Sequence, residues 1–181
     1  MVVLPRVNML RNQKNAMLEL KQRLNEKGMT LPQAPTPVGA YSATIQSGNY
    51  LYVSGQFPFK DGKLQYKGQL GKDLSTHEGY LAAELCALNL LSQIDANMKD
   101  NKLNQIVKLD GYINSSEWFE GHAKVLDGAT NLLASVLDNK AGHARSVMGC
   151  TSLPYCAAVE ITAVIELEKK ITTQKLNNKT D

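Results

Sequence analysis

Apolar residues recur along the chain at two different spacings, and the two spacings predict different elements. Intervals near three and four residues, typical of amphipathic helices, occur in three segments: residues 8–27, 75–94 and 125–137. Gly28 follows the first segment, as glycine commonly does at a helix C-terminus. Ser75 and Glu78 have the spacing of a capping box at the start of the second. The sequence therefore predicts an N-terminal helix and two core helices.

Shorter segments rich in β-branched and aromatic residues predict strands. Six are expected: residues 41–47, 50–54, 63–67, 106–113 and the two segments that contain Arg145 and Glu160. Gly48-Asn49 separates the first two segments and indicates a hairpin. Asp61-Gly62 marks a second tight turn, after which residues 63–67 would add an edge strand.

The order of these elements favours an α+β fold, with a single sheet covered by two helices on one face. The other sheet face would be bare in a monomer, and symmetric association is the usual way to cover such a face. We expect an N-terminal helical extension over residues 1–30, one domain over residues 31–168 and a polar tail over residues 169–181. A second domain is not expected in a chain of 181 residues.

The composition is that of an ordinary globular protein. Hydrophobic residues make up 43% and charged residues 20% of the chain, which excludes a chain that is disordered throughout. No apolar run approaches the roughly 20 residues of a membrane span, so we expect no membrane association. The net charge of +3 is too small to favour nucleic acid as a partner.

The residues that commonly bind metals are scattered. Neither the cysteines nor the histidines have metal-ligand spacing, so we expect no metal and no other cofactor: the residues are Cys86, Cys150, Cys156, His77, His122 and His143. An odd number of cysteines without redox spacing suits a reducing compartment. A cytoplasmic location is therefore expected, with the mitochondrial matrix as the alternative.

The segment from His143 to Glu166 places charged residues on two probable strands. Strand residues alternate between faces, so Arg145 shares one side of its strand with Val147. On the last strand, Glu160 and Glu166 share one side, and the other side is wholly apolar: Val159, Ile161, Ala163, Ile165 and Leu167. One face of that strand must therefore pack on helices, and the other holds the polar chemistry.

This segment resembles a signature of the YjgF-type reactive intermediate deaminases (Rid proteins). Members of that family carry an Ala-Arg-Ser stretch, a Leu-Pro turn and an Ile-Glu-Ile strand in this order, and the chain has Ala144-Arg145-Ser146, Leu153-Pro154 and Val159-Glu160-Ile161. Two upstream segments are also similar: residues 37–42 resemble the family's Gly-Pro-Tyr entry, and residues 51–58 its Ser-Gly-Gln-Ile-Pro strand. The opening of the match, which spans Leu31 to about Glu168, is similar to that of the branch called YjgF-like or endoribonuclease L-PSP-like.

The resemblance implies a fold, an assembly and a set of site residues. The fold would be chorismate mutase-like and the assembly a homotrimer, with three sites in the clefts between subunits. Arg145 would grip the carboxylate of a 2-imino or enamine acid, because a guanidinium donates two parallel hydrogen bonds to a carboxylate. Glu160 would position the water that attacks the imine carbon.

Four further residues match positions that line the family's cleft. Tyr41 and Ser54 would form its wall, and Gly55 would let a ligand approach the backbone closely. Asp127 lies near the position where many relatives have an asparagine, although the alignment requires a small insertion there.

Several of these residues also have a purely structural interpretation. Arg145 could form a salt bridge with Glu160 or Glu166 of the neighbouring strand, and Tyr41 could belong to the core. Val147 stands where many deaminases have a cysteine, and Thr162 replaces the second glutamate of their last strand. These departures bear on substrate preference more than on the type of reaction. His143, two residues before Arg145 and on the same face, could tune the charge of the cleft near neutral pH.

Two functions from different classes follow from these residues. The first is a cofactor-free hydrolytic deaminase of reactive 2-imino or enamine acids, which would give 2-oxo acids and ammonia. The alternative is a non-catalytic trimer that binds a carboxylate ligand or has a regulatory role. RNA cleavage is a third and weaker reading, because the chain has no stripe of aromatic and basic residues.

Overall fold

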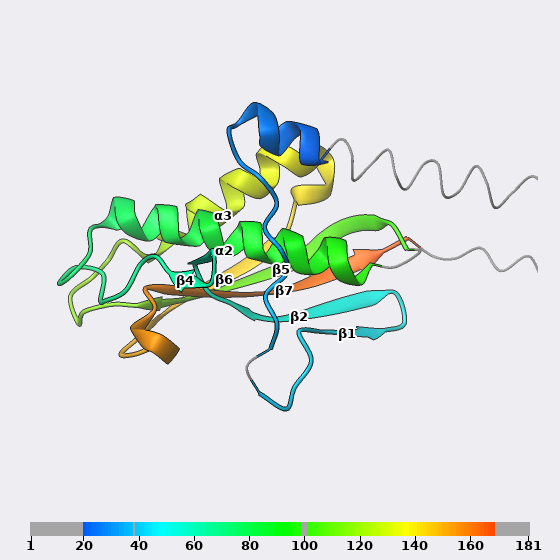
Figure 1. Cartoon of the computed structure of the whole chain (residues 1–181). Coiled ribbons are helices and arrows are strands. Elements are labelled where there is room, and N and C mark those ends of the chain that lie inside the picture. The colour runs from blue at the N-terminus through cyan, green and yellow to red at the C-terminus, as the bar shows by residue number, and fades with distance from the viewer. Residues whose placement is uncertain (1–19, 38, 99–100, 169–181) are drawn as a thin grey trace, which may run out of the picture.

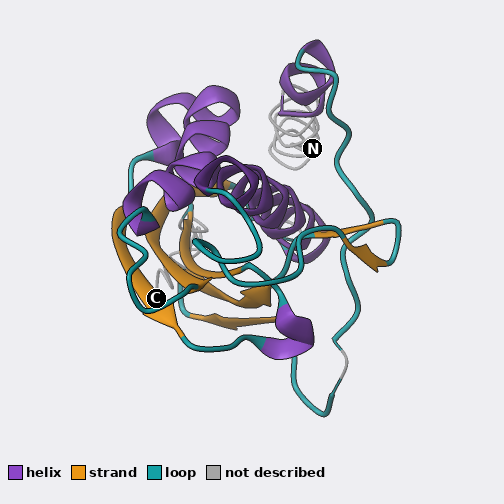
Figure 2. Ribbon diagram, turned by 90° about the vertical axis from the view of Figure 1, so that its left-hand side faces the viewer, coloured by secondary structure: helices purple, strands orange, loops and turns teal. Residues whose placement is uncertain are grey.

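Helices α2 (Thr76–Asn97) and α3 (His122–Leu137) cover the same face of a five-stranded sheet (Figures 1 and 2). The structure is a computed structural model, and it describes residues 20–37, 39–98 and 101–168. The sheet has the strand order β1 (Thr44–Ser47), β2 (Tyr50–Gln56), β7 (Val159–Leu167), β5 (Leu103–Asn114) and β6 (Ala144–Cys150). The predicted α+β fold, with one main sheet and two helices on one face, is confirmed.

The position of β6 corrects one sequence-based interpretation. β6 lies at the edge of the sheet and pairs in parallel with β5, whereas β5 and β7 pair antiparallel. A parallel pair needs a crossover connection, and α3 supplies it between β5 and β6. The interpretation of Arg145 and Glu160 as residues of neighbouring strands is therefore wrong, because β5 lies between β6 and β7.

The predicted turns and caps form where the sequence indicated. Ser47 pairs with Tyr50 across the Gly48-Asn49 turn. Ser75 accepts a hydrogen bond from the backbone N–H of Glu78, while the Glu78 carboxylate accepts one from the backbone N–H of Ser75, which completes the capping box of α2. Both reciprocal bonds satisfy N–H groups that a helix start leaves unpaired.

The second hairpin does not join the main sheet. β3 (Phe59–Lys60) and β4 (Lys63–Leu64) pair only with each other, across the Asp61-Gly62 turn, in a separate two-stranded sheet. The predicted edge strand over residues 63–67 is thus reduced to two residues in another sheet. Lys67 instead forms an isolated bridge with Ala157.

Alternation along β7 separates the core from the opposite face of the sheet. Its five odd-numbered residues are buried beneath the helices, whereas Glu160, Thr162, Val164 and Glu166 are partly exposed. We call the face without helices the open face. Large apolar side chains are exposed on it: Ile45, Tyr50, Tyr52 and Met148. This is the face that a partner subunit is expected to cover.

The N-terminal segment packs on the helical layer (Figure 1). Residues 20–26 are helical, and the turn ends at Gly28 with φ 70°. Leu20 and Leu24 are buried in the main core, and Lys21 forms an ion pair with Asp95 of α2 at 3.0 Å. The rest of the predicted helix (residues 8–19) and the predicted tail (residues 169–181) lie outside the described residues. Among the described residues, no helix is both long and apolar enough to span a membrane.

Candidate functional site

The Glu160 carboxylate lies directly over Gly55, where β7 meets β2. A methyl group built at Gly55 would stand 1.7 Å from Oε1 of Glu160, so only glycine leaves room for this carboxylate. The sequence suggested that Gly55 admits a ligand to the backbone, but the space above its Cα holds Glu160. Burial raises the pKa of the Glu160 carboxyl above its ordinary value. The site therefore contains a partly desolvated carboxylate.

A β-bulge in β2 presents Ser54 and Gly55 at this point. The register between β2 and β7 shifts between Val53 and Gln56, which inserts an extra residue into β2. Bulges often occur beside functional sites because they redirect side chains. The Ser54 hydroxyl donates a hydrogen bond to the Ser42 carbonyl at 2.8 Å, and its lone pairs can still accept one.

A cavity of about 570 Å³ opens beside the bulge. Tyr41, Ser54 and Gly55 line it, and the proline-rich connector over residues 32–37 forms another wall. Tyr41 is 55% exposed, so its ring belongs to this surface and not to the core. Three of the residues that the sequence placed in the cleft therefore line one cavity; Glu160 is not among the lining residues but lies against one of them, Gly55.

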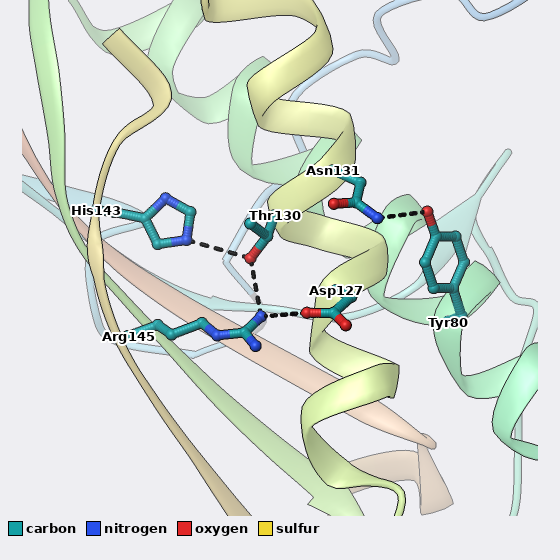
Figure 3. Close-up of polar contacts among 6 residues, drawn as sticks. All are labelled: Tyr80, Asp127, Thr130, Asn131, His143 and Arg145. Atoms are coloured by element: carbon teal, nitrogen blue, oxygen red, sulfur yellow. Dashed lines mark hydrogen bonds and ion pairs between the residues drawn. The ribbon is translucent and has the colours of Figure 1, made fainter. Parts of the chain in front are cut away.

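Arg145 belongs to a second cluster, on the helical side of the sheet (Figure 3). Its Nη1 donates to Oδ1 of Asp127 at 2.7 Å and to Oγ1 of Thr130 at 3.2 Å, both on α3. The ion-pair partner of Arg145 is therefore Asp127 and not Glu160 or Glu166, as the structural interpretation of the sequence supposed. The hydrogen bonds of the described residues involve only Nη1 of this side chain, so Nε and Nη2 can still form a two-pronged contact with a carboxylate.

His143 supports the same cluster through Thr130. Its Nδ1 lies 2.5 Å from the Ala141 carbonyl oxygen. A carbonyl can only accept, so Nδ1 carries the proton and Nε2 can accept from the Thr130 hydroxyl at 3.3 Å. Thr130 in turn accepts from Arg145. This directional chain orients the guanidinium.

The two clusters lie on different sides of one sheet. Arg145 stands beside buried Leu109 in the β5–β6 register, on the face that the helices cover. Glu160 stands beside Tyr112 in the β5–β7 register, on the open face. Of the predicted site residues, the structure joins Arg145 to Asp127, places Glu160 against Gly55, and brings Gly55, Ser54 and Tyr41 into one cavity wall. It does not bring Arg145 and Glu160 together within one chain.

Sequence reasoning missed the aromatic wall of the cavity. Phe57, Phe59 and Tyr155 line it together, although Tyr155 follows Phe59 by almost a hundred positions in the sequence. Tyr155 lies in the short helical turn η2 (Pro154–Cys156) and has φ 61°. The Leu153-Pro154 motif marked this turn in the sequence, but no neighbouring residue indicated that Tyr155 would line the cavity.

Residues 21–167 match the model of a protein family described as YjgF/chorismate mutase-like, putative endoribonuclease. The match includes every strand and both long helices of the domain.

Individual relatives are similar over most of their length. Protein TCP17 of Trypanosoma cruzi is 40% identical over 146 residues, which cover 80% of this chain and 91% of that protein. A 2-iminobutanoate/2-iminopropanoate deaminase of Dermatophagoides farinae is 26% identical over 145 residues, which cover 77% of this chain and 95% of that protein. Atu1372, a protein of unknown function from Agrobacterium tumefaciens, has a crystal structure that matches with a TM-score of 0.82 and 38% identity, over 87% of this chain and 98% of that chain.

Proposed function

The chain belongs to the YjgF/chorismate mutase-like family, as its motifs indicated, and from this premise we propose that it is a hydrolytic deaminase of reactive 2-imino and enamine acids. The relative from Dermatophagoides farinae carries the name of such an enzyme. The proposal rests on this chain's own residues, and above all on the desolvated Glu160 carboxylate over Gly55.

Glu160 has the properties of a base that activates water. Because burial raises its pKa, its carboxylate takes a proton more readily than an ordinary glutamate does, while it remains ionised at pH values above that pKa. The Glu160 carboxylate lies against Gly55, and Gly55 also lines the cavity. A water molecule held between Glu160 and a ligand would be suitably placed to attack.

In the proposed reaction the water oxygen forms a bond to the imine carbon while Glu160 takes a proton from the water. Glu160 returns that proton to the nitrogen, which gives an amino alcohol. The remaining proton of the former water then moves from the hydroxyl to the nitrogen as the carbon–oxygen double bond forms and the carbon–nitrogen bond breaks. The products are a 2-oxo acid and ammonia, and no oxidant or reductant is consumed. Positioning and charge could supply the acceleration, because bringing reactants together removes a large part of the entropic barrier.

Arg145 would bind the substrate carboxylate from a neighbouring subunit. Within one chain its guanidinium and the Glu160 carboxylate lie on opposite faces of the sheet, with β5 between their strands. A symmetric trimer that covers the open face would let the edge strand β6 of one subunit approach the cavity of the next. The homotrimer and its shared clefts are therefore part of this proposal.

A carboxylate-binding protein without catalysis is the second candidate. It needs only the carboxylate contact of Arg145, whose Nη1 bonds Asp127 and Thr130 while Nε and Nη2 can still bind a ligand. RNA cleavage, which the family description names, has less support here. His122 is within hydrogen-bond distance of Ser115, and His143 of Ala141 and Thr130, and among the described residues no hydrogen bond joins the two histidines.

Release of ammonia and 2-oxo acid from freshly generated imines tests the proposal. An amino-acid oxidase with catalase would generate the imines, and the rate would be compared with spontaneous hydrolysis. We expect clear acceleration by the wild type, its loss in Arg145→Ala and poor recovery in Arg145→Lys, because an ammonium cannot form the two-pronged contact. If the protein binds a 2-oxo acid but does not accelerate imine hydrolysis, the second candidate, a binding protein without catalysis, is the better account.

A further inference from the structure

We propose that the cavity beside Gly55 holds the side chain of an aryl-substituted 2-imino acid, such as the imine formed from phenylalanine. This inference rests on the proposed function and names the substrate class of the same site. The starting observation is size: a cavity of about 570 Å³ falls in the range of about 300–1,000 Å³ that is usual for drug-sized ligands. A small aliphatic imino acid would leave most of it to water.

The wall of the cavity is a cluster of three aromatic rings. Phe57 and Phe59 have ring centroids 6.4 Å apart, and Tyr155 lies 5.9 Å from Phe57 and 5.8 Å from Phe59. All three pairs are edge-to-face, with interplanar angles of 79° to 90°. A further ring can extend such a cluster, because ring edges carry positive and ring faces negative partial charge. An aromatic side chain is therefore the group that this wall complements best.

The two sides of the cavity are fixed to the same helix. Asn89 of α2 donates from its side-chain amide to the carbonyl oxygens of Phe57 at 2.8 Å and Phe59 at 2.9 Å. One turn later, Gln93 donates to the Pro35 carbonyl of the connector at 2.6 Å. Both amide side chains are almost fully buried. The cavity is therefore held open before a ligand arrives, which lowers the entropic cost of binding.

Tyr155 reaches the cavity through an unfavourable backbone conformation. Tyr155 has φ 61° and the next residue, Cys156, has φ 56°, a region that residues with side chains rarely adopt. Such conformations cost about 1–3 kcal/mol each and are concentrated at functional sites. The ring they present is 50% exposed, so burial in the core does not explain its position. Contact with a ligand that covers the ring would explain it.

The position of the cavity relative to Glu160 agrees with this occupant. Gly55 lines the cavity and also lies against the Glu160 carboxylate. A substrate with its imine carbon beside Glu160 would extend its side chain past Ser54 toward Phe57 and Phe59. The carboxylate of the substrate would remain at the opening, where the neighbouring Arg145 is proposed to bind it.

A comparison of imines tests the inference. Imines generated from phenylalanine, leucine and alanine would be supplied to the wild-type protein, and kcat/KM would be measured for each. We expect the phenylalanine imine to exceed the alanine imine by roughly 10-fold or more, since even one methylene group in an apolar pocket is worth about 10-fold or more. Equal kcat/KM values for the three imines would overturn the inference.

Two variants locate the preference in the aromatic wall. Tyr155→Asn removes a ring and is compatible with the backbone conformation at this position, because asparagine tolerates positive φ. Phe59→Leu removes a second ring but keeps an apolar side chain. Both should lower the ratio of kcat/KM for the phenylalanine imine to that for the alanine imine by roughly 10-fold. Tyr80→Leu is the control, since Tyr80 lies on α2 outside the cavity. A preference that survives both cavity variants would contradict the inference.

Calorimetric binding of non-reactive 2-oxo acids separates this inference from the proposed function. Phenylpyruvate should bind more tightly than 2-oxobutanoate in the wild type, and Tyr155→Asn should remove the difference. If no imine is hydrolysed but this pattern is found, the deaminase proposal fails and the aryl site stands. If imines are hydrolysed without any aryl preference in binding or turnover, the deaminase proposal stands and the aryl site fails.

Discussion

Arg145 and Glu160 extend from opposite faces of the same sheet, and β5 lies between the two strands that carry them. Arg145 contacts the helical layer through Asp127 at 2.7 Å, whereas Glu160 lies over Gly55 on the open face. One subunit therefore cannot place both groups on one small ligand. If both act on the same substrate, as we propose, the working unit is an oligomer.

The assembly can be tested through the open face. We expect the wild type to be a trimer in light scattering, and Tyr52→Asp to lower the mass to that of a monomer. Tyr52 is 48% exposed and stands beside Val164 and Ile45, so a charge there would be buried in the interface at a cost of several kcal/mol. His77→Asp, on the exposed start of α2, is the control. If the wild type is monomeric at micromolar concentration, the proposal of a cleft shared between subunits is wrong.

Gly55→Ala should displace the catalytic carboxylate without unfolding the protein. The added methyl group would overlap the end of the Glu160 side chain, which is flexible, and the backbone at Gly55 needs no positive φ. We expect kcat for imines to fall on the order of 100-fold, as for loss of a general base, with little change in the thermal midpoint. Gly142→Ala, where a methyl group meets no atom within 4 Å, should be as active as wild type. Full activity of Gly55→Ala would show that Glu160 need not occupy this place.

Glu160→Gln should lower activity and change the dependence of stability on pH. The folded pKa of Glu160 lies above its ordinary value of 4.5 because burial disfavours the charge. The folded protein therefore holds this proton more tightly than the unfolded chain, and stability falls as pH rises from about that ordinary value through the folded pKa. The glutamine variant lacks this decrease, so we expect it to be relatively more stable at neutral pH in urea titrations.

Protonation of Glu160 should also set the acid limb of the pH–activity profile. Wild-type kcat/KM should fall as pH decreases through the raised pKa of Glu160, at a pH above that at which an ordinary glutamate titrates. The glutamine variant should lose on the order of 100-fold in kcat and keep its binding of 2-oxo acids. An active glutamine variant with an unaltered acid limb would assign the base to another group.

Asp127→Asn should tighten the binding of 2-oxo acids. The asparagine keeps an oxygen that can accept from Arg145 but removes the negative charge beside it. Because both side chains are partly exposed, the effect should stay within about 1 kcal/mol, or roughly 5-fold in Kd, with little change in stability. Calorimetry with 2-oxobutanoate would measure it. Weaker binding would mean that the Asp127 carboxylate itself contacts the ligand, as the sequence suggested.

Local features of the fold could be predicted because they depend on neighbouring residues. The capping box of Ser75 and Glu78 and the two-residue turn at Gly48-Asn49 are such features. So is the alternation of β7, because a strand with one apolar side must bury that side. These signals were sufficient for the α+β class and for the helix-covered face.

The arrangement of the site depended on contacts between distant segments. Nothing within residues 143–167 indicates that β5 separates the strands of Arg145 and Glu160, because strand order is set by the packing of the whole domain. The partner of Arg145 was missed for the same reason, since Asp127 comes from a helix of another segment. The sequence singled out Gly55 as a place where a ligand approaches the backbone, but the space above its Cα holds the Glu160 side chain.

Mixing two inactive variants is the most direct test of a site shared between subunits. Arg145→Ala keeps Glu160, and Glu160→Gln keeps Arg145, so a mixed assembly contains interfaces at which both groups are intact. With random mixing in equal amounts, about a quarter of the interfaces in a cyclic trimer would be restored, and we predict about that fraction of wild-type imine hydrolysis. Mixed trimers that native mass spectrometry verifies, but that remain as inactive as their parents, would contradict the shared site.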